Sequence, residues 1–446
     1  MAKQHIHFVG IGGIGMSALA RYYLAQNWAV FGSDVEKSII TSDLIKDGIS
    51  VKIGQKKENI SPIFDRIIKS QAVQETNPEI LEARRLGLKV FSYPEAVGEL
   101  TKDIKTIAIA GAHGKSTTTA MIAKILVDAK LDPMVILGAK FDFFDGRNFR
   151  LGKNYLVLEA DEFGRAFLNY YPTHTVILNI DREHLDIYSG LKDIKDTFLR
   201  FISQTKPGGI LILNRDDKNI FSLKNKIEKI ALKNKLKIIW FSYSDKIQAE
   251  IFGALPIPGR QNRTDAIAAY NLALSLKVSK KKILESLSGY PGLWRRMEHK
   301  GPAFDGRATV FDDYAHHPSE IKATLSAFRE KYPDSPILCV FKPHQASRLK
   351  ILFRDFLNSF SAADKIIILP TYIVLGRDID EKVLTAKKLA EDLAKKYPTK
   401  KIVYLSDSDK LKSTLYSLLS AANPKPSVII MMGAGSIANL TKSILN

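Results

Sequence analysis

Cysteine is nearly absent from the sequence, with Cys339 the only one among 446 residues. A single thiol cannot form an internal disulfide or a cysteine-rich metal site, which excludes disulfide-stapled secreted domains. No apolar run approaches the ~20 residues that a membrane-spanning helix requires, and the longest clean runs, such as residues 428–432, have the length of a strand. The N-terminus lacks a charged head followed by an apolar segment, so we expect no signal peptide. These absences predict a cytosolic protein without membrane insertion.

Acidic residues are few relative to basic ones. The 47 Asp and Glu against 66 Lys and Arg give a formal net charge of +19, which raises the hypothesis of nucleic-acid binding. The basic residues are spread along the chain, and short clusters such as residues 280–282 are better explained as solvated faces. We therefore expect no nucleic-acid partner, although a basic protein still attracts polyanions such as nucleotides.

Short β-branched runs alternate with helical patterns almost from end to end, which is typical of α/β folds with parallel sheets. The length allows two to four domains. Turn-rich stretches near residue 104 and at residues 290–292 predict two boundaries. The sequence thus predicts three consecutive domains over residues 1–104, 105–293 and 294–446. Each is expected to be an α/β domain. The predicted strands cover residues 6–9, 28–32, 67–70, 88–91, 106–110, 155–158, 176–179, 210–213, 309–312, 337–341, 365–369, 401–405 and 428–432.

A glycine-rich motif follows the first predicted strand. Residues 10–15 read Gly-Ile-Gly-Gly-Ile-Gly, which contains the G-x-G-x-x-G pattern between a strand and a helix. Such glycines permit a tight turn and let a pyrophosphate approach the helix N-terminus. Asp34 ends the second strand, where dinucleotide-binding folds carry a ribose-binding acid. Taken alone, the motif predicts a nicotinamide-cofactor site, with a glycine turn needed only for packing as the alternative.

A second loop, residues 111–119, reads Gly-Ala-His-Gly-Lys-Ser-Thr-Thr-Thr and joins a predicted strand to a helix. It departs from the strict P-loop pattern, because Ile109 stands where that pattern has glycine. The features that bind phosphate in a P-loop are nevertheless present. The backbone can cradle phosphates, Lys115 can reach the β- and γ-oxygens of the nucleotide, and the Ser116 hydroxyl can bind Mg²⁺. A threonine run at a helix start is hard to explain by packing alone. The loop predicts ATP binding.

Carboxylates and a histidine follow two further strands of the central domain. Residues 159–162 read Glu-Ala-Asp-Glu, and residues 179–184 read Asn-Ile-Asp-Arg-Glu-His. At the carboxyl ends of strands beside a phosphate loop, such groups are positioned to complete metal coordination. Glu159 and His184 are the candidate ligands, with a solvated acidic loop as the alternative. Histidine is unusual for Mg²⁺ alone, so Mn²⁺ stays open.

Together these segments resemble the Mur ligase family, whose members use ATP to join an amino acid or a peptide to a cell-wall precursor. The likeness covers nearly the whole chain in the family's order and is greatest to the members that attach L-alanine to UDP-N-acetylmuramic acid. These two molecules are the expected partners, and the oligomeric state stays open. The matching segments are residues 7–17, 33–34, 111–115, 159–162, 259–262, 295–296, 313–318 and 343–348.

The resemblance implies a Rossmann-like first domain that binds UDP, a central P-loop-type ATPase domain and a Rossmann-like third domain. It also implies a role for each matching position. The UDP-sugar would be bound by Gly12, Gly13, Ile14, Gly15, Ser17 and Asp34. ATP would be bound by Gly111, His113, Gly114, Lys115, Ser116, Thr117, Asn262, Arg296 and Asp313. The metal ligands would be Ser116, Glu159 and His184. The amino acid would be lined by Tyr314, His316 and Arg348, the last of which would pair with its carboxylate.

The implied reaction forms an acyl phosphate from the substrate carboxylate and ATP, and the amine then displaces phosphate through a tetrahedral intermediate. Bringing anionic centres together requires cations, which Lys115, Arg296 and two metals would supply. With His184 assigned to metal, His316 is the candidate for proton transfer, and substrate positioning is an equal alternative. An acyl phosphate must be kept from water, so we expect the third domain to close by rotation near residues 290–293.

Several features depart from the family's pattern. Gln261 stands where the family usually has histidine, Gln345 replaces a common arginine, and Ser436 stands in place of an aspartate. With glutamine in place of arginine at position 345, the site has one cation fewer, which could change the amino acid that it selects. Between residues 241 and 255 only a short segment remains where these ligases typically carry several strands, so we expect the sheet edge to be shorter or covered differently.

Three other functions compete with this interpretation. A sister ligase that attaches a recycled tripeptide shares the ATP machinery, but residues 12–15, 343–348 and 432–435 favour the alanine-adding members. An NAD-dependent oxidoreductase leaves the loop around Lys115 unexplained. A nucleic-acid-binding ATPase has no known reader motif to support it. Glycine and L-serine remain open beside L-alanine, because one methyl group is worth only about 1–3 kcal/mol of discrimination.

Overall fold

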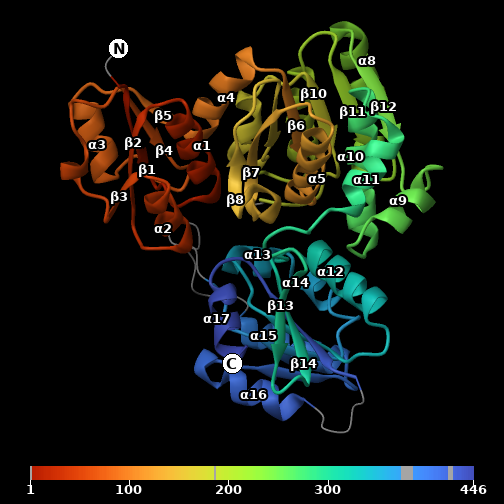
Figure 1. Cartoon of the computed structure of the whole chain (residues 1–446). Helices are drawn as coiled ribbons and strands as arrows, with labels where there is room; N and C mark the ends of the chain where they lie inside the picture. The colour runs from red at the N-terminus through yellow and green to blue at the C-terminus, as the bar shows by residue number, and fades with distance from the viewer. Residues whose placement is uncertain (1–2, 185–186, 373–384, 420–424, 446) are drawn as a thin grey trace. The chain divides into compact units, whose positions relative to one another are not determined.

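The computed structural model describes residues 3–184, 187–372, 385–419 and 425–445 (Figure 1). The chain forms two compact units. The first contains the residues up to 183, 187–255 and 264–291, and the second contains residues 256–263 and 292 onward together with His184. Two sheets lie in the first unit and one in the second, and most of their strand pairs are parallel, which confirms the predicted α/β class. Within the described residues, no helix combines the length and the apolar character needed to cross a bilayer.

The first sheet has five parallel strands in the order β3-β2-β1-β4-β5. The strands are β1 His5–Val9, β2 Ala29–Asp34, β3 Ser50–Ile53, β4 Arg66–Lys69 and β5 Val90–Ser92, and the helices are α1 Ile14–Ala25, α2 Ile39–Lys46, α3 Pro78–Arg85 and α4 Tyr93–Asp103. The strand order reverses between β1 and β4. The glycine loop leaves the carboxyl end of β1, which is where such sheets bind ligands.

The central sheet has seven strands in the order β12-β11-β10-β6-β9-β7-β8, and only β8 is antiparallel to its neighbour. The strands are β6 Thr106–Ala110, β7 Pro133–Phe141, β8 Arg147–Arg150, β9 Tyr155–Glu159, β10 His174–Ile177, β11 Ile210–Asn214 and β12 Lys237–Phe241. The helices are α5 Lys115–Asp128, α6 Leu191–Ser203, α7 Lys218–Phe221, α8 Lys224–Asn234, α9 Gln248–Ala254, α10 Arg260–Ser275 and α11 Lys280–Ser288. Because β6 lies between β9 and β10, the loops after these three strands meet at one edge.

The short segment after β12 folds as helix α9. This helix packs against α11, where Lys280 donates to Glu250 at 2.7 Å. The rings of Tyr243 and Phe252 lie 5.1 Å apart. A helix, rather than further strands, therefore follows the edge strand β12. Helix α10 begins at Arg260, directly after Gly259.

The second unit holds a six-stranded sheet in the order β13-β14-β18-β15-β16-β17, with β13 antiparallel to β14. The strands are β13 Glu298–Ala303, β14 Ala308–Asp313, β15 Ile337–Phe341, β16 Lys365–Ile368, β17 Lys401–Tyr404 and β18 Ser427–Met432. The helices are α12 Pro318–Lys331, α13 Ala346–Ile351, α14 Phe353–Leu357, α15 Ala386–Lys396, α16 Leu411–Leu418 and α17 Ile437–Ile444.

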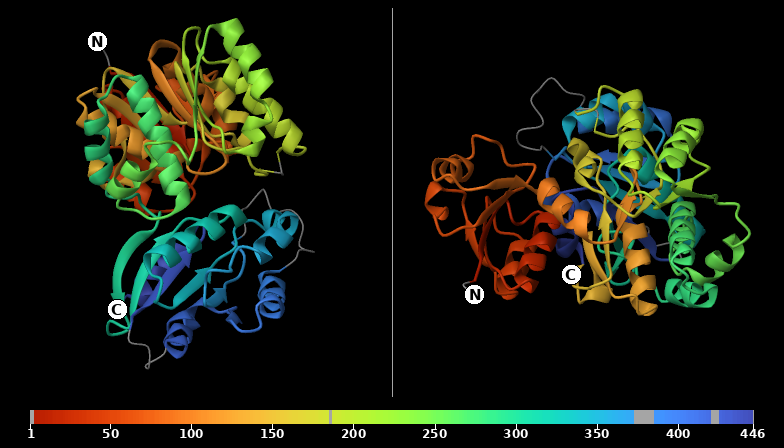
Figure 2. Two further views of the ribbon diagram at one scale, coloured as in Figure 1. Left: turned by 90° about the vertical axis from the view of Figure 1, so that its right-hand side faces the viewer. Right: turned by 90° about the horizontal axis from the view of Figure 1, so that it is seen from above.

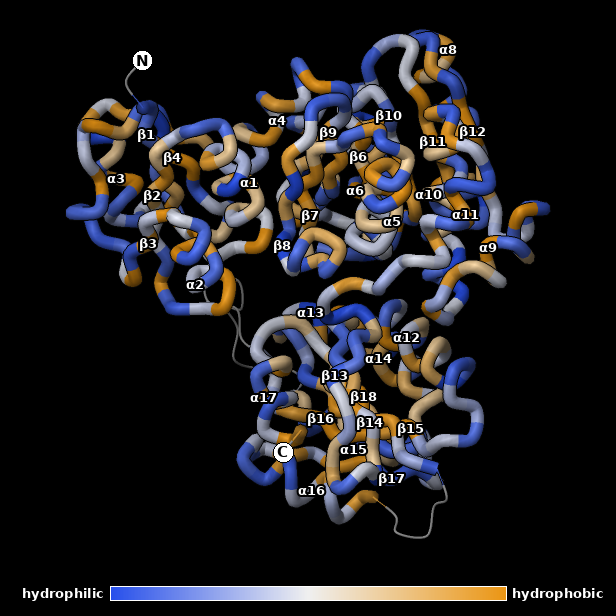
Figure 3. Tube along the Cα trace, viewed as in Figure 1, coloured by the Kyte–Doolittle hydropathy of each residue, from blue (hydrophilic) through white to orange (hydrophobic). Residues whose placement is uncertain are grey.

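Helices cover both faces of this sheet (Figure 2). Side chains alternate between the faces along each strand, so Cys339 and Phe341 join one hydrophobic cluster while Leu338 and Val340 join the other. The central strands β18, β15 and β16 are accordingly strongly hydrophobic (Figure 3). Burial raises the pKa of the Cys339 thiol, consistent with a packing role for this lone cysteine.

Candidate active site

The phosphate loop connects β6 to α5 and contains two glycines with unusual backbone angles. Gly111 has φ +150° and Gly114, the N-cap of α5, has φ +85°. A Cβ atom on Gly114 would lie 2.6 Å from Oδ1 of Asp265, a residue of α10 that is 5% exposed. Both the left-handed backbone and the close carboxylate therefore require glycine at position 114. Asp265 did not stand out in the sequence, since it is distant from the loop along the chain.

Lys115 is held over its own loop by several acceptors. Its Nζ donates to Gly111 O at 2.7 Å and to Glu162 Oε2 at 2.9 Å, and it lies 3.5 Å from Asp161 Oδ1. Burial by itself lowers the pKa of Lys115, but Glu162, Asp161 and Glu159 outweigh it and raise the pKa. The ammonium is thus firmly charged, as a phosphate-binding lysine must be.

Ser116 and Glu159, two of the predicted metal ligands, are in contact. The Ser116 hydroxyl donates to Glu159 Oε2 at 2.9 Å, and the backbone N–H of Gly138 donates to Oε1. Burial raises the pKa of Glu159, against the lowering effect of these two donors. A hydroxyl and a carboxylate side by side form an all-oxygen donor set that fits a hard divalent cation.

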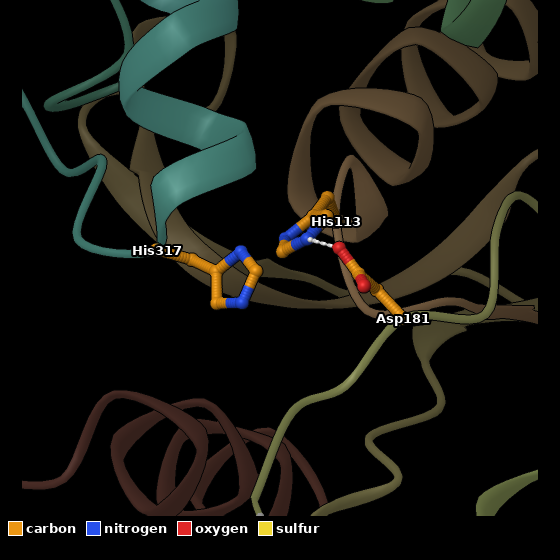
Figure 4. A group of neighbouring side chains, drawn as sticks. All are labelled: His113, Asp181 and His317. Atoms are coloured by element: carbon orange, nitrogen blue, oxygen red, sulfur yellow. Dashed lines mark hydrogen bonds and ion pairs between the residues drawn. The ribbon is translucent and has the colours of Figure 1, made fainter. Parts of the chain in front are cut away.

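The backbone of His113 is clamped by an asparagine at the end of the neighbouring strand. The His113 N–H donates to Asn179 Oδ1 at 2.8 Å, and Asn179 Nδ2 donates to His113 O at 2.9 Å. The His113 Nε2 atom lies 3.2 Å from Asp181 Oδ2 (Figure 4). Asn179 and Asp181 both belong to the segment that the sequence singled out, and the structure gives them loop-positioning contacts. His184 has φ +54° and groups with the second unit, so its assignment to a metal remains a prediction.

The glycine loop of the first sheet is held by Asp34. The Asp34 Oδ2 atom accepts the Gly12 N–H at 2.8 Å, and a Cβ on Gly12 would lie equally close to it. The carboxylate therefore shapes the loop, while its predicted contact with the UDP end of the substrate is untested. Gly13 is the N-cap of α1 and offers no side-chain cap, so the first amides of this helix are suited to binding an anionic ligand.

The loop is also bonded to the central domain through Asn148 of β8, which is 1% exposed. The Asn148 side-chain amide donates to Ile14 O and to Ser17 Oγ, the second at 3.1 Å. Arg21 Nη1 in turn donates to Asn148 Oδ1 at 2.6 Å. Ser17, expected at the UDP-sugar, thus participates in a polar bridge between the two sheets. The sequence gives no sign of this role for Asn148, because the residues around it form no recognisable motif.

A cavity of about 310 Å³ runs between the glycine loop and Glu159. Its walls include the start of α1, the loop after β4, the start of α4, the middle of β7 and the end of β9. The lining residues are Gly13, Ile14, Gly15, Met16, Ser70, Gln71, Ala72, Tyr93, Ile136, Leu137, Gly138, Glu159, Asp161, Phe163, Ala166 and Tyr170. This single cavity connects the predicted UDP-sugar site with the predicted metal site.

In the second unit, Asp313 organises the loop after β14. Its carboxylate accepts Met297 N–H at 2.8 Å, Ala315 N–H at 2.9 Å and the Thr324 hydroxyl at 3.2 Å. Burial raises the pKa of Asp313. The predicted contact of Asp313 with ATP remains a prediction, and the contacts described give it a positioning role.

A series of aromatic rings runs from this loop to the loop after β15. The Tyr314 and His316 ring centroids are 5.3 Å apart, those of His316 and His344 are 5.9 Å apart, and Tyr372 stacks on His344 at 5.3 Å. Arg348 Nη1 donates to His344 O at 3.2 Å. The structure thus brings the three predicted amino-acid residues into one group and adds His344 and Tyr372.

Arg296 and Asn262 are two further predicted site residues of the second unit. The Arg296 guanidinium lies 5.2 Å from the Tyr314 ring centroid and 3.7 Å from Glu320 Oε1. Asn262, predicted to bind adenine, is 8% exposed and donates to Pro258 O at 2.6 Å. Its contact with the base remains a prediction.

The departures at 345 and 436 lie at this edge of the sheet. Gln345 is 3% exposed with φ +66°, and its Nε2 has no hydrogen-bond partner in the described part of the chain. Lys342 Nζ donates to the Ser436 hydroxyl at 3.0 Å, and burial lowers the pKa of this lysine. A lysine–serine contact therefore occupies position 436, where the resemblance leads one to expect an acid.

Comparisons with known proteins match this arrangement along the chain. Family models for the Mur ligase catalytic, middle and glutamate ligase domains match residues 5–105, 109–273 and 295–435. The UDP-N-acetylmuramate–L-alanine ligase of Clostridium acetobutylicum is 37% identical over 409 residues, which cover 88% of each chain. The chain belongs to the Mur ligase family. The ligase of the same name from Persephonella marina is 37% identical over 99% of this chain and 96% of its own.

Solved structures agree with the membership. A UDP-N-acetylmuramate–alanine ligase from Thermotoga maritima superposes with a TM-score of 0.80 at 25% identity, covering 98% of this chain and 97% of its own. A murein peptide ligase from Psychrobacter arcticus, at 23% identity and a TM-score of 0.71, shares the fold. The first and third sheets of this Mur ligase lie within their matched segments, and the central sheet does so except for the first three residues of β6.

Proposed function

We propose that this Mur ligase joins L-alanine to UDP-N-acetylmuramic acid, giving UDP-N-acetylmuramoyl-L-alanine, ADP and phosphate. The chain is an ATP-dependent ligase that forms an amide bond, as its family and full-length relatives are. The observation that carries the proposal is the cavity that links the glycine loop to Glu159, beside the Lys115 loop. It supports a sugar nucleotide bound at one end with its carboxylate directed toward the phosphate loop at the other.

In this proposal Lys115 binds the transferring phosphoryl group. Its present partner Glu162 would give way to phosphate oxygens, so the cation would move from a carboxylate to a more highly charged ligand. Ser116 and Glu159 would hold Mg²⁺ or Mn²⁺, with His184 as a further ligand. The bound cation would neutralise phosphate oxygens during transfer. Arg296 would add positive charge from the second unit.

His316 would assist proton transfer from the amine. Its Nδ1 lies 3.0 Å from Tyr314 O, a geometry in which Nδ1 carries the proton and Nε2 is the basic atom. Arg348, next to His344, would pair with the carboxylate of the amino acid. Since the proposed substrates, ATP and a UDP-sugar, are cytoplasmic metabolites, we propose that the enzyme acts in the cytoplasm.

The test is phosphate release from ATP in the presence of UDP-N-acetylmuramic acid, with L-alanine, glycine, L-serine and the tripeptide assayed in parallel. Release that requires both the sugar nucleotide and L-alanine is the expected result. Release with the tripeptide alone would reassign the enzyme to cell-wall recycling. Higher rates with glycine or L-serine than with L-alanine would contradict the proposed amino acid and direct attention to Gln345.

A further inference from the structure

Tyr93 is the first residue of α4, and the chain fixes it firmly there. Ser92 and Glu95 form a reciprocal capping box, in which Glu95 Oε2 accepts the Ser92 N–H at 2.7 Å, and Pro94 follows at the first turn. The side chain points from this helix start toward α1. A Cβ built on Gly15 would lie 2.9 Å from both Cζ and Oη of Tyr93. The phenol therefore lies directly against the first turn of α1.

The same side chain lines the 310 Å³ cavity. In the part of the chain that the structure describes, no protein group forms a hydrogen bond with the Tyr93 hydroxyl, although this cavity is lined by Glu159 and Asp161. Burial, together with Glu159 and Asp161, raises the pKa of the Tyr93 phenol above its ordinary value, so the hydroxyl is protonated at neutral pH and can donate to an anion. A donor without a protein partner, on a residue that lines a substrate cavity, is suited to a ligand oxygen.

The N-terminus of α1, which lies beside Tyr93, indicates which kind of ligand oxygen the hydroxyl would bind. Gly13 gives α1 no side-chain cap, and the Gly12 amide is already taken by Asp34. The next amides of the first turn, close to the Tyr93 hydroxyl, are therefore the ones that favour a diphosphate. A hydroxyl placed at the same turn adds a side-chain donor to these backbone donors.

We propose that Tyr93 binds the diphosphate of the sugar nucleotide by donating its phenolic hydrogen to a phosphate oxygen at the first turn of α1. This inference rests on the proposed function, since it assumes a UDP-linked substrate in this cavity. It also gives Gly15 a specific reason to be glycine, because any larger residue would displace the phenol. Tyr93 is thus a substrate-binding residue that no sequence motif indicated.

The experiment compares the wild-type chain with Tyr93→Phe, which removes one oxygen and keeps the ring against Gly15. Binding of UDP and of uridine is measured by NMR titration, and the Michaelis constants are measured in the ligase assay. UDP binding is expected to weaken about ten- to hundredfold, as for loss of a hydrogen bond to a charged group, with uridine binding unchanged. The KM for the sugar nucleotide rises in parallel, while the KM values for ATP and L-alanine stay constant.

Tyr155→Phe is the matched control. Tyr155 opens β9 at the amino end of the central sheet, away from the cavity, so its variant should bind UDP as the wild type does. Equal affinity of Tyr93→Phe and wild type for UDP would overturn the inference while leaving the ligase intact. An equal loss of uridine and UDP binding would also overturn it, because a contact to diphosphate cannot affect the nucleoside. Failure of the wild-type chain to bind UDP would contradict the proposed function itself.

Discussion

The crowding at Gly114 gives a prediction whose magnitude follows from the geometry. In Gly114→Ala the alanine must adopt the left-handed backbone conformation of Gly114, which costs about 1–2 kcal/mol. It must also displace Asp265, whose Oδ1 would lie 2.6 Å away. Overpacking against a buried group typically costs a further 1–3 kcal/mol or so. We therefore expect a total loss of about 2–5 kcal/mol in the free energy of unfolding, together with a strong rise in the KM for ATP.

Gly146 provides the matched control. It also has a positive φ, +71°, but a Cβ there would meet nothing within 4 Å. Gly146→Ala should therefore show only the conformational cost of about 1–2 kcal/mol. The difference between the two variants isolates the contact with Asp265.

The measurement is urea-induced unfolding of both variants, followed by a fluorescence signal and compared at the transition midpoints. Asp265→Ala and the double variant complete a thermodynamic cycle, in which the coupling energy should recover the crowding cost. Equal destabilisation by Gly114→Ala and Gly146→Ala would refute the reasoning. A coupling energy near zero between positions 114 and 265 would do the same.

Three further predictions follow from the charged groups. Burial raises the pKa of Asp312 to about 6, above its ordinary value of 3.8, so the folded state binds more protons than the unfolded state between these values. Stability should therefore rise as the pH falls from 7 to 4, and urea midpoints of Asp312→Asn should lack this rise. Glu159→Gln removes a carboxylate whose pKa burial raises. The metal-free variant should be at least as stable as wild type at pH 7 in thermal unfolding, yet its activity should fall about a hundredfold or more through loss of transition-state charge stabilisation. Arg348→Lys should raise the KM for L-alanine about tenfold, because a point charge replaces a planar fork, and an unchanged KM would remove Arg348 from the amino-acid site.

The local motifs were predictable from the sequence because their residues are neighbours along the chain and need no tertiary contact to come together. Lys115 and Ser116 follow a glycine at a strand end, and this order alone fixes their position at a helix start. The contact between Ser116 and Glu159 was also foreseeable, since adjacent parallel strands end at the same edge.

The supporting residues could not be predicted in this way. Asp265 and Asn148 reach their partners through tertiary packing, without any spacing rule that connects them. Strand β7 begins with Pro133 and contains Gly138, both unfavourable for a strand by composition. The charged residues of β8, read as Arg-Asn-Phe-Arg, conceal a strand that pairs antiparallel at the sheet edge.

The hydrogen bonds of Asn148 mean that the glycine loop is held in place by the central domain as well as by its own. Ile14, Ser17 and Arg21 of α1 all bond to one side chain from β8. A chimaera that took its sugar-nucleotide domain from a relative would leave this asparagine facing unfamiliar partners. The donated domain would have to be transplanted together with β8, so the unit of exchange between such enzymes is larger than the sheet that carries the glycine loop.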